Sequence, residues 1–86
     1  AERISVSGTK GLHGHALGAT GAMETAICAM SLERGQLPGT ANLADLDPAC
    51  DLDIIPPCGR PQQVEHLLCN AFGFGGVNAS LAMRAV

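Results

Sequence analysis

A helical pattern built from unusually small residues runs from about Leu17 to Arg34. Its apolar residues recur at the i, i+3, i+4 spacing of one buried helix face, and they are Ala19, Ala22, Met23, Ala26, Ile27 and Met30. Gly18 and Gly21 each cost the helix about 1 kcal/mol relative to alanine, a cost that close approach of another backbone can offset. Gly35 supplies a C-terminal cap. We therefore expect a helix buried inside a larger assembly.

The composition also indicates a core larger than this chain can build alone. Hydrophobic residues make up 47% of the 86 residues, yet there are two Phe, no Tyr and no Trp. Large aromatic side chains usually supply much of the buried area, and small domains bury a limited share of their surface. We therefore expect residues 1–86 to be one incomplete portion of a larger α/β domain.

Charge and cysteine usage narrow the class of protein. The net charge of −3 gives no reason to expect nucleic acid or an anionic membrane as a partner. No apolar run approaches the ~20 residues that a bilayer-spanning helix needs. The cysteines lack both C-x-x-C spacing and the density of a secreted disulfide framework, and they are Cys28, Cys50, Cys58 and Cys69. We expect four reduced, structural thiols in a cytoplasmic protein.

The remaining elements are predicted from alternation and from turn residues. Residues 4–7 form a short strand, and residues 36–62 form an irregular, proline-rich connector with a brief strand at Ile54 and Ile55. The acidic run in that connector lacks the calcium-loop pattern and is expected to be solvated. Two strands, Val64–Ala71 and 77–85, form a terminal hairpin around the loop Phe72–Gly76.

The candidate chemistry begins with a lysine and two histidines on a glycine-broken segment, residues 9–15. A lysine near an imidazole disfavours the charged ring, and a neutral His15 can donate a hydrogen bond to a developing oxyanion. Lys10 is the lysine in question. The residues alone leave a purely structural His15 equally open. A zinc site at His13 and His15 lacks a third ligand at plausible spacing.

The glycine loop Phe72–Gly76 holds both aromatic residues of the chain. It lacks the Lys-Ser/Thr of a P-loop and the third glycine and following helix of a dinucleotide site. Two phenylalanines on such a loop can line a cavity or swing. None of the cysteines has an evident activating neighbour, so no nucleophile is expected within this chain.

Two long segments resemble motifs of the beta-ketoacyl-[acyl carrier protein] synthases. Gly8–Ala22 resembles their Thr-Lys-x-x-x-Gly-His-x-x-Gly-Ala-x-Gly motif, and Cys69–Ala79 resembles their Asn-x-Phe-Gly-Phe-Gly-Gly-x-Asn motif. Asn42–Leu43 and Cys50–Asp53 look like the connector of the elongating type II class. The similarity runs from about residue 4 to residue 84, in the order of the family.

This resemblance implies a thiolase-like α/β fold, of which the chain would be part of the C-terminal half: strand, buried helix, connector and antiparallel hairpin. It implies acyltransferase activity in fatty acid biosynthesis, by a decarboxylating Claisen condensation of malonyl-carrier protein with an acyl-cysteine thioester. The implied partners are acyl carrier protein and a second identical subunit. No organic cofactor, metal, nucleic acid or membrane span is implied.

The resemblance also assigns roles by motif position. His15 would donate to the malonyl thioester oxygen, Lys10 would be its electrostatic partner, and Glu24 would hold that lysine. Phe74 would be the gating phenylalanine, with its backbone N–H in the oxyanion hole. The supporting residues would be Phe72, Gly73, Gly75 and Gly76, which give the loop mobility, and Asn70, which falls near a structural monovalent-cation site that only some family members have. His13 stands where many family members have a smaller residue.

The nucleophilic cysteine of the family and its first catalytic histidine have no counterpart motif in these 86 residues. We therefore expect this chain alone to be inactive. Three alternatives remain open: a non-catalytic partner that resembles a chain-length factor, a synthase for polyketides or other specialised acyl chains, and a free-standing binding module. The exposed apolar surface that an isolated 86-residue chain would have disfavours the binding module.

Overall fold

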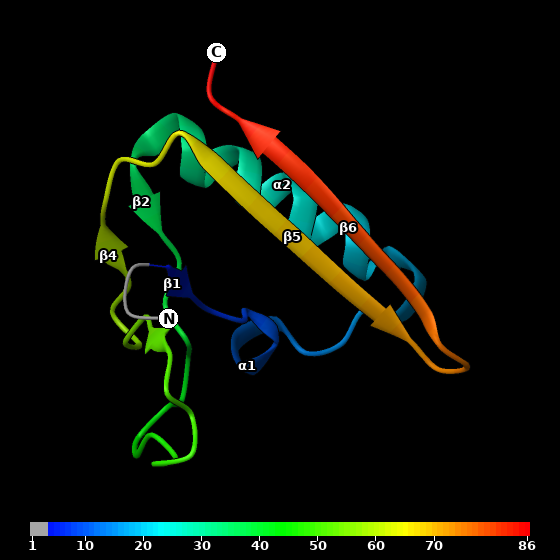
Figure 1. Ribbon diagram of the computed structural model, residues 1–86, viewed down its shortest axis with the longest axis horizontal. Helices are drawn as coiled ribbons and strands as arrows, with labels where there is room; N and C mark the ends of the chain where they lie inside the picture. Colours follow the sequence, from blue (N-terminus) through cyan, green and yellow to red (C-terminus); the bar gives the residue numbers. More distant parts are fainter. Residues whose placement is uncertain (1–3) are drawn as a thin grey trace.

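A long β-hairpin packs against one face of a four-turn helix, and most of the short elements are gathered at the left of this pair in Figure 1. The computed structural model describes residues 4–86. Along the chain, the elements are β1 (Ser5–Val6), α1 (Lys10–His13), η1 (Leu17–Ala19), α2 (Thr20–Arg34), β2 (Gln36–Leu37), β3 (Asp53–Ile54), β4 (Arg60–Pro61), β5 (His66–Gly73) and β6 (Val77–Arg84). The α/β class predicted from the sequence is confirmed.

The predicted helical range, Leu17 to Arg34, is helical throughout. Its first three residues form the 3₁₀ turn η1, and the rest form α2. Gly35 adopts a left-handed conformation, with φ of 62°, and its N–H donates to the Ser31 carbonyl at 3.0 Å. This is the cap that the sequence predicts. The expected burial is not met within this chain, because only Thr20, Ser31 and Leu32 are buried on α2.

The small residues at the start of this helix have open space beside them. A Cβ atom added at Gly18 or Gly21 would meet nothing within 4 Å. Met23 and Met30, both on the predicted apolar face, are 37% and 45% exposed. The close backbone approach that these glycines would permit is therefore not made by residues 4–86, and it stays a prediction about a larger assembly.

Strands β5 and β6 pair antiparallel in register, with Leu67 opposite Met83 and Cys69 opposite Leu81. The predicted loop was too long, because β5 continues through Phe72 and Gly73 and pairs them with β6. The turn is left with Phe74, Gly75 and Gly76, and both glycines have φ above +80°. Positive φ at successive positions is what glycine supplies without steric cost.

The short strands of the connector hold it against the N-terminal segment. Strand β1 pairs in parallel with β3, so that Ser5 lies opposite Asp53, and the Ile55 N–H donates to the Val6 carbonyl at 2.9 Å. Ile55 itself is buried, with 2% of its surface exposed. The brief strand predicted at residues 54–55 is thus found one residue earlier. Strands β2 and β4 form a second, antiparallel pair that the sequence did not predict.

A polar network joins β1, β3 and β4. The Arg60 guanidinium donates to both carboxylate oxygens of Asp53, at 2.7 and 2.9 Å, and to the Ser5 hydroxyl oxygen at 2.7 Å. The Ser5 hydroxyl in turn donates to the Gln62 side-chain oxygen at 3.0 Å. The hydrogen bond from Arg60 holds the pKa of the Asp53 carboxyl below its ordinary value.

Within residues 4–86, none of the helices has the length and apolar character of a bilayer-spanning one.

We predict that Arg60→Gln loosens this corner of the fold. Removing the bidentate donor leaves the Asp53 carboxylate with only a long contact to the Ser5 hydroxyl, at 3.4 Å, and Gln62 competes for the single proton of that hydroxyl. The β1–β3 pair should therefore open more often. Amide hydrogen exchange at Ile55, whose N–H donates across that pair, should be faster in the variant at neutral pH. Arg34→Gln, at the exposed end of α2, is the matched control and should leave Ile55 exchange unchanged. Equal exchange in Arg60→Gln and the parent would contradict the prediction.

The same network predicts a pH dependence of known sign. Because the folded-state pKa of Asp53 is lowered from 3.8, the contribution of the ion pair is complete above pH 3.8 and is lost as the pH falls through the lower folded value. A carbon-detected NMR titration of the Asp53 carboxyl should therefore have its midpoint below 3.8. In Arg60→Gln the midpoint should move upward. A parent midpoint at or above 3.8 would rule out the pairing in solution.

Candidate active site

Lys10 is held by an ion pair with the long helix. It is the first residue of α1, a single turn that Gly14 closes by donating its N–H to the Lys10 carbonyl at 2.8 Å. The Lys10 Nζ atom lies 2.5 Å from Oε1 of Glu24 on α2. The Glu24 side chain is 14% exposed and that of Lys10 46% exposed. The structure thus brings these two predicted site residues together, and their roles stay predictions.

His15 is held by its Nδ1 atom. The backbone N–H of Leu17 donates to Nδ1 at 2.9 Å, and the Thr20 hydroxyl oxygen lies 3.2 Å from the same atom. A backbone N–H can only donate, so Nδ1 has to present its lone pair. The proton of the neutral ring is therefore on Nε2, where it can be donated to a ligand. Leu17 has φ of 52°, a strained value for a residue other than glycine, directly beside this contact.

His13 has the opposite tautomer. Its Nδ1 lies 2.7 Å from the Gly14 carbonyl oxygen, which can only accept, so Nδ1 carries the proton. Its Nε2 then accepts from the Thr9 hydroxyl at 2.7 Å. Both ring nitrogens of His13 are thus engaged by its own segment. Across residues 4–86 there is no group of three or more His, Cys, Asp or Glu side chains that could hold a metal ion.

Phe74 lies on a different element from Lys10 and His15. It occupies the turn between β5 and β6, with its side chain fully exposed, and Phe72 is also exposed. Figure 1 shows this turn at the lower right, well separated from α1. Among the described residues, no hydrogen bond or ion pair connects the turn to Lys10 or His15. Asn70, on β5, accepts a hydrogen bond from the Ser80 hydroxyl at 2.6 Å.

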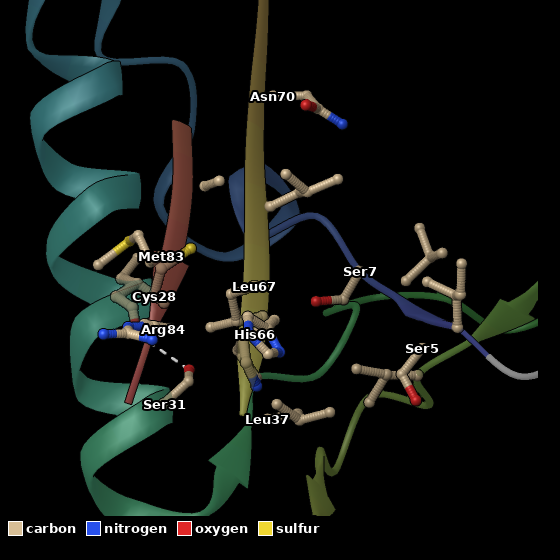
Figure 2. Close-up of a pocket in the computed structure, with 17 residues that line it drawn as sticks. Ser5, Ser7, Cys28, Ser31, Leu37, His66, Leu67, Asn70, Met83 and Arg84 are labelled. Atoms are coloured by element: carbon tan, nitrogen blue, oxygen red, sulfur yellow. Dashed lines mark hydrogen bonds between the residues drawn. The ribbon is translucent and has the colours of Figure 1, made fainter. Parts of the chain in front are cut away.

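A cavity of about 840 Å³ lies elsewhere, between β1, α2 and β5. Figure 2 shows Ser5 and Ser7 on one side of it, Cys28 on α2, and His66 and Asn70 along β5. Neither Lys10 nor His15 lines this cavity. Its lining comes partly from β1 and β5, which belong to separate sheets, and no local sequence pattern reveals that arrangement.

Cys28 and Cys69 lie side by side between α2 and β5. Burial raises the pKa of the Cys28 thiol to about 11. The charge of Cys69, a hydrogen bond with Cys69 and the charge of Glu24 raise this pKa further. All four cysteines are free, as the sequence predicts.

The sequence interpretation missed a polar stripe on α2. Thr20, Glu24 and Cys28 are spaced four residues apart, so they follow one face of the helix. Thr20 contacts His15, Glu24 contacts Lys10, and Cys28 contacts Cys69. The signal was visible as polar side chains at regular four-residue spacing beside the apolar face. It was overlooked because the glycines and alanines of the same helix dominate its pattern.

The sequence of this chain matches one protein family and several known proteins. The family model described as "Beta-ketoacyl synthase, C-terminal domain" matches residues 1–44. "Nodulation protein E" of Rhizobium sp. (strain N33) is 45% identical over 86 residues, which are 100% of this chain and 21% of that protein. "3-oxoacyl-[acyl-carrier-protein] synthase 2" of Coxiella burnetii is 41% identical over 86 residues, which are also 100% of this chain and 21% of that protein. "Tetracenomycin polyketide synthase ketoacyl synthase alpha subunit" of Streptomyces glaucescens is 42% identical over 80 residues, 93% of this chain and 19% of that protein. The chain spans about a fifth of the length of these relatives.

We predict that Cys28 reacts slowly with alkylating reagents. A pKa of about 11 in place of the ordinary 9.0 leaves about a hundredfold fewer thiolates at neutral pH, and the thiolate is the nucleophile. A time course with iodoacetamide, read by peptide mass mapping, should show Cys28 labelled well after the exposed Cys50 and Cys58. In urea the sites should react alike. Glu24→Gln should speed the labelling of Cys28, and labelling as fast as that of Cys50 in the folded parent would contradict the assignment.

Proposed function

This chain belongs to the beta-ketoacyl synthase family, and on that premise we propose that the protein containing it is a 3-oxoacyl-[acyl carrier protein] synthase. In the proposed reaction an acyl group is held as a thioester on a cysteine outside this chain. A malonyl group on acyl carrier protein loses CO2, and the resulting C2 carbanion attacks the acyl carbonyl carbon. The cysteine thiolate leaves, and the 3-oxoacyl product remains on the carrier protein.

The observation that carries this proposal is the tautomer of His15. Loss of CO2 places negative charge on the malonyl thioester oxygen, and a fixed donor aimed at that oxygen stabilises the charge. With Nδ1 occupied by the Leu17 N–H, His15 offers a donor at Nε2. A charged imidazolium has no lone pair at Nδ1 and would lose that bond. His15 therefore suits the role of a neutral donor better than that of a base.

The other proposed site residues support this step. Lys10 supplies positive charge close to His15 in the sequence, and its pairing with Glu24 keeps the ammonium group over α2. Phe74, on a turn with two glycines at positive φ, has the freedom that a gate needs. Phe72 and Gly73 flank the turn, and Asn70 lies further along β5. As partners we propose acyl carrier protein and a second copy of the synthase.

A second candidate function is synthesis of a polyketide or another specialised acyl chain. It is favoured by the relatives named for nodulation and for a polyketide synthase, whose identities to this chain match or exceed that of the 3-oxoacyl-[acyl-carrier-protein] synthase 2. A non-catalytic partner that resembles a chain-length factor is the remaining alternative. Acyl transfer to a cysteine in the full-length polypeptide separates that alternative from both synthases, because a non-catalytic partner would not be acylated.

We predict that His15→Ala abolishes decarboxylation and spares acylation. Removing the oxyanion donor should slow CO2 release from malonyl-carrier by about 10²- to 10³-fold. Acyl transfer from acyl-carrier to the nucleophile, followed by intact mass, should be nearly unchanged. His13→Ala is the matched control on the same segment, since both nitrogens of that ring are engaged locally. Condensation at the parent rate in His15→Ala would reject the proposed role.

We also predict that Phe74→Ala alters the passage between the two half-reactions. A side chain exposed on a glycine turn contributes little to the stability of this fold, so the thermal midpoint should change little. The rates of acylation and of condensation, measured separately in rapid-mixing experiments, should change by different factors. Val77→Ala, at the next exposed apolar position, is the control. Unchanged rates for both steps in Phe74→Ala would remove the gating role.

A further inference from the structure

We infer that the Thr20 hydroxyl is a positioning group for His15, which it holds in the tautomer with the proton on Nε2. This inference rests on the proposed function for its kinetic consequence, whereas its structural content stands by itself. Thr20 is the first residue of α2, and its side chain is buried, with 8% of the residue exposed. Its hydroxyl oxygen lies 3.2 Å from His15 Nδ1.

The direction of this hydrogen bond follows from the second partner of the ring. Leu17 donates its N–H to Nδ1 at 2.9 Å, so the nitrogen presents a lone pair and carries no proton. A hydroxyl at the same nitrogen then has to be the donor. Thr20 thus adds a second donor to Nδ1. The Leu17 bond requires the proton on Nε2, and the Thr20 hydroxyl, by donating to the same nitrogen, favours that tautomer further.

The other hydroxyl groups of α2 behave differently. Thr25 donates to the Gly21 carbonyl at 2.7 Å, and Ser31 donates to the Ile27 carbonyl at 2.9 Å. Both follow the common pattern of a helical hydroxyl that bonds the carbonyl four residues earlier. Thr20 departs from it because its hydroxyl is directed to the His15 ring. Within residues 4–86, the Thr40 hydroxyl is the only buried side-chain polar group without a hydrogen-bond partner. The Thr20 hydroxyl therefore has its partner, the His15 ring.

The burial of Thr20 adds to its effect. A buried hydroxyl has little access to water, so its donor is committed to the ring rather than shared with solvent. The rigid first turn of α2 fixes where that donor lies. The Leu17 N–H belongs to a residue with positive φ just ahead of the helix. Thr20 therefore ties the orientation of the His15 ring to the helix, and Leu17 ties it to the preceding segment.

The test uses the full-length polypeptide that contains this chain, with three variants. Thr20→Val removes the hydroxyl at constant shape, Thr20→Ser keeps it, and Thr25→Val makes the same change five residues further along the helix. Malonyl-carrier decarboxylation should lose roughly 2- to 10-fold in kcat with Thr20→Val, the range for a neutral hydrogen bond, at unchanged KM. Thr20→Ser should restore the rate, and Thr25→Val should have the parent rate.

Nitrogen NMR of the histidine-labelled protein gives a readout independent of activity. The His15 signals, assigned by their loss in His15→Asn, should show the Nε2-protonated tautomer in the parent and in Thr20→Ser. In Thr20→Val they should shift toward the average of the two tautomers. A parent with the proton on Nδ1, or a Thr20→Val spectrum identical to that of the parent, would overturn the inference.

The outcomes separate this inference from the proposed function. If the parent protein does not decarboxylate malonyl-carrier, the proposed function fails, while the nitrogen spectra still decide the role of Thr20. If the parent is active and Thr25→Val loses as much activity as Thr20→Val, the effect is a general one on the helix and the positioning role is rejected. If Thr20→Val does not fold, the parent and Thr20→Ser spectra still decide the tautomer.

Discussion

The candidate site depends on the packing of α2 against the β5–β6 hairpin, because this packing fixes the helix that holds the site residues. One stripe of this helix, formed by Thr20, Glu24 and Cys28, contacts three separate parts of the chain. The first two residues hold the His15 ring and the Lys10 ammonium group, and the third lies against β5. A helix keeps side chains four residues apart at nearly constant separation. The two charged or polar groups of the N-terminal motif are therefore positioned relative to one rigid element rather than to each other.

Much of this arrangement follows from local sequence. The helix, its glycine cap and the antiparallel hairpin were predicted from periodicity and turn residues, and they are confirmed. The shorter elements escaped prediction for a physical reason: strands of two residues, such as β2 and β4, exist only through pairing with distant residues. The extra length of β5 has a different origin, since Phe72 extends the strand by pairing with the nearby Asn78 across the turn.

The candidate site was predicted less completely than the fold. Lys10, Glu24 and His15 follow from the resemblance to a family, and the structure shows what holds each of them. The tautomer of His15 could not be predicted, because it depends on a backbone N–H whose direction is set by the conformation around Leu17. The separation of the β5–β6 turn from α1 is likewise a matter of tertiary arrangement. Leu68 and Phe72 are exposed along the hairpin, as apolar residues are at surfaces that contact other protein.

The parallel pairing of β1 with β3 has a consequence for the order in which the chain folds. It joins residues 48 positions apart, whereas the hairpin turn joins strands across three residues. The entropy of closing the longer loop is greater by about 2 kcal/mol at 25 °C, and this cost precedes any gain from the contact. We therefore expect the hairpin and α2 to form first. The β1–β3 ladder and the Arg60 network would close last, after the local contacts that hold Lys10 and His15 to α2.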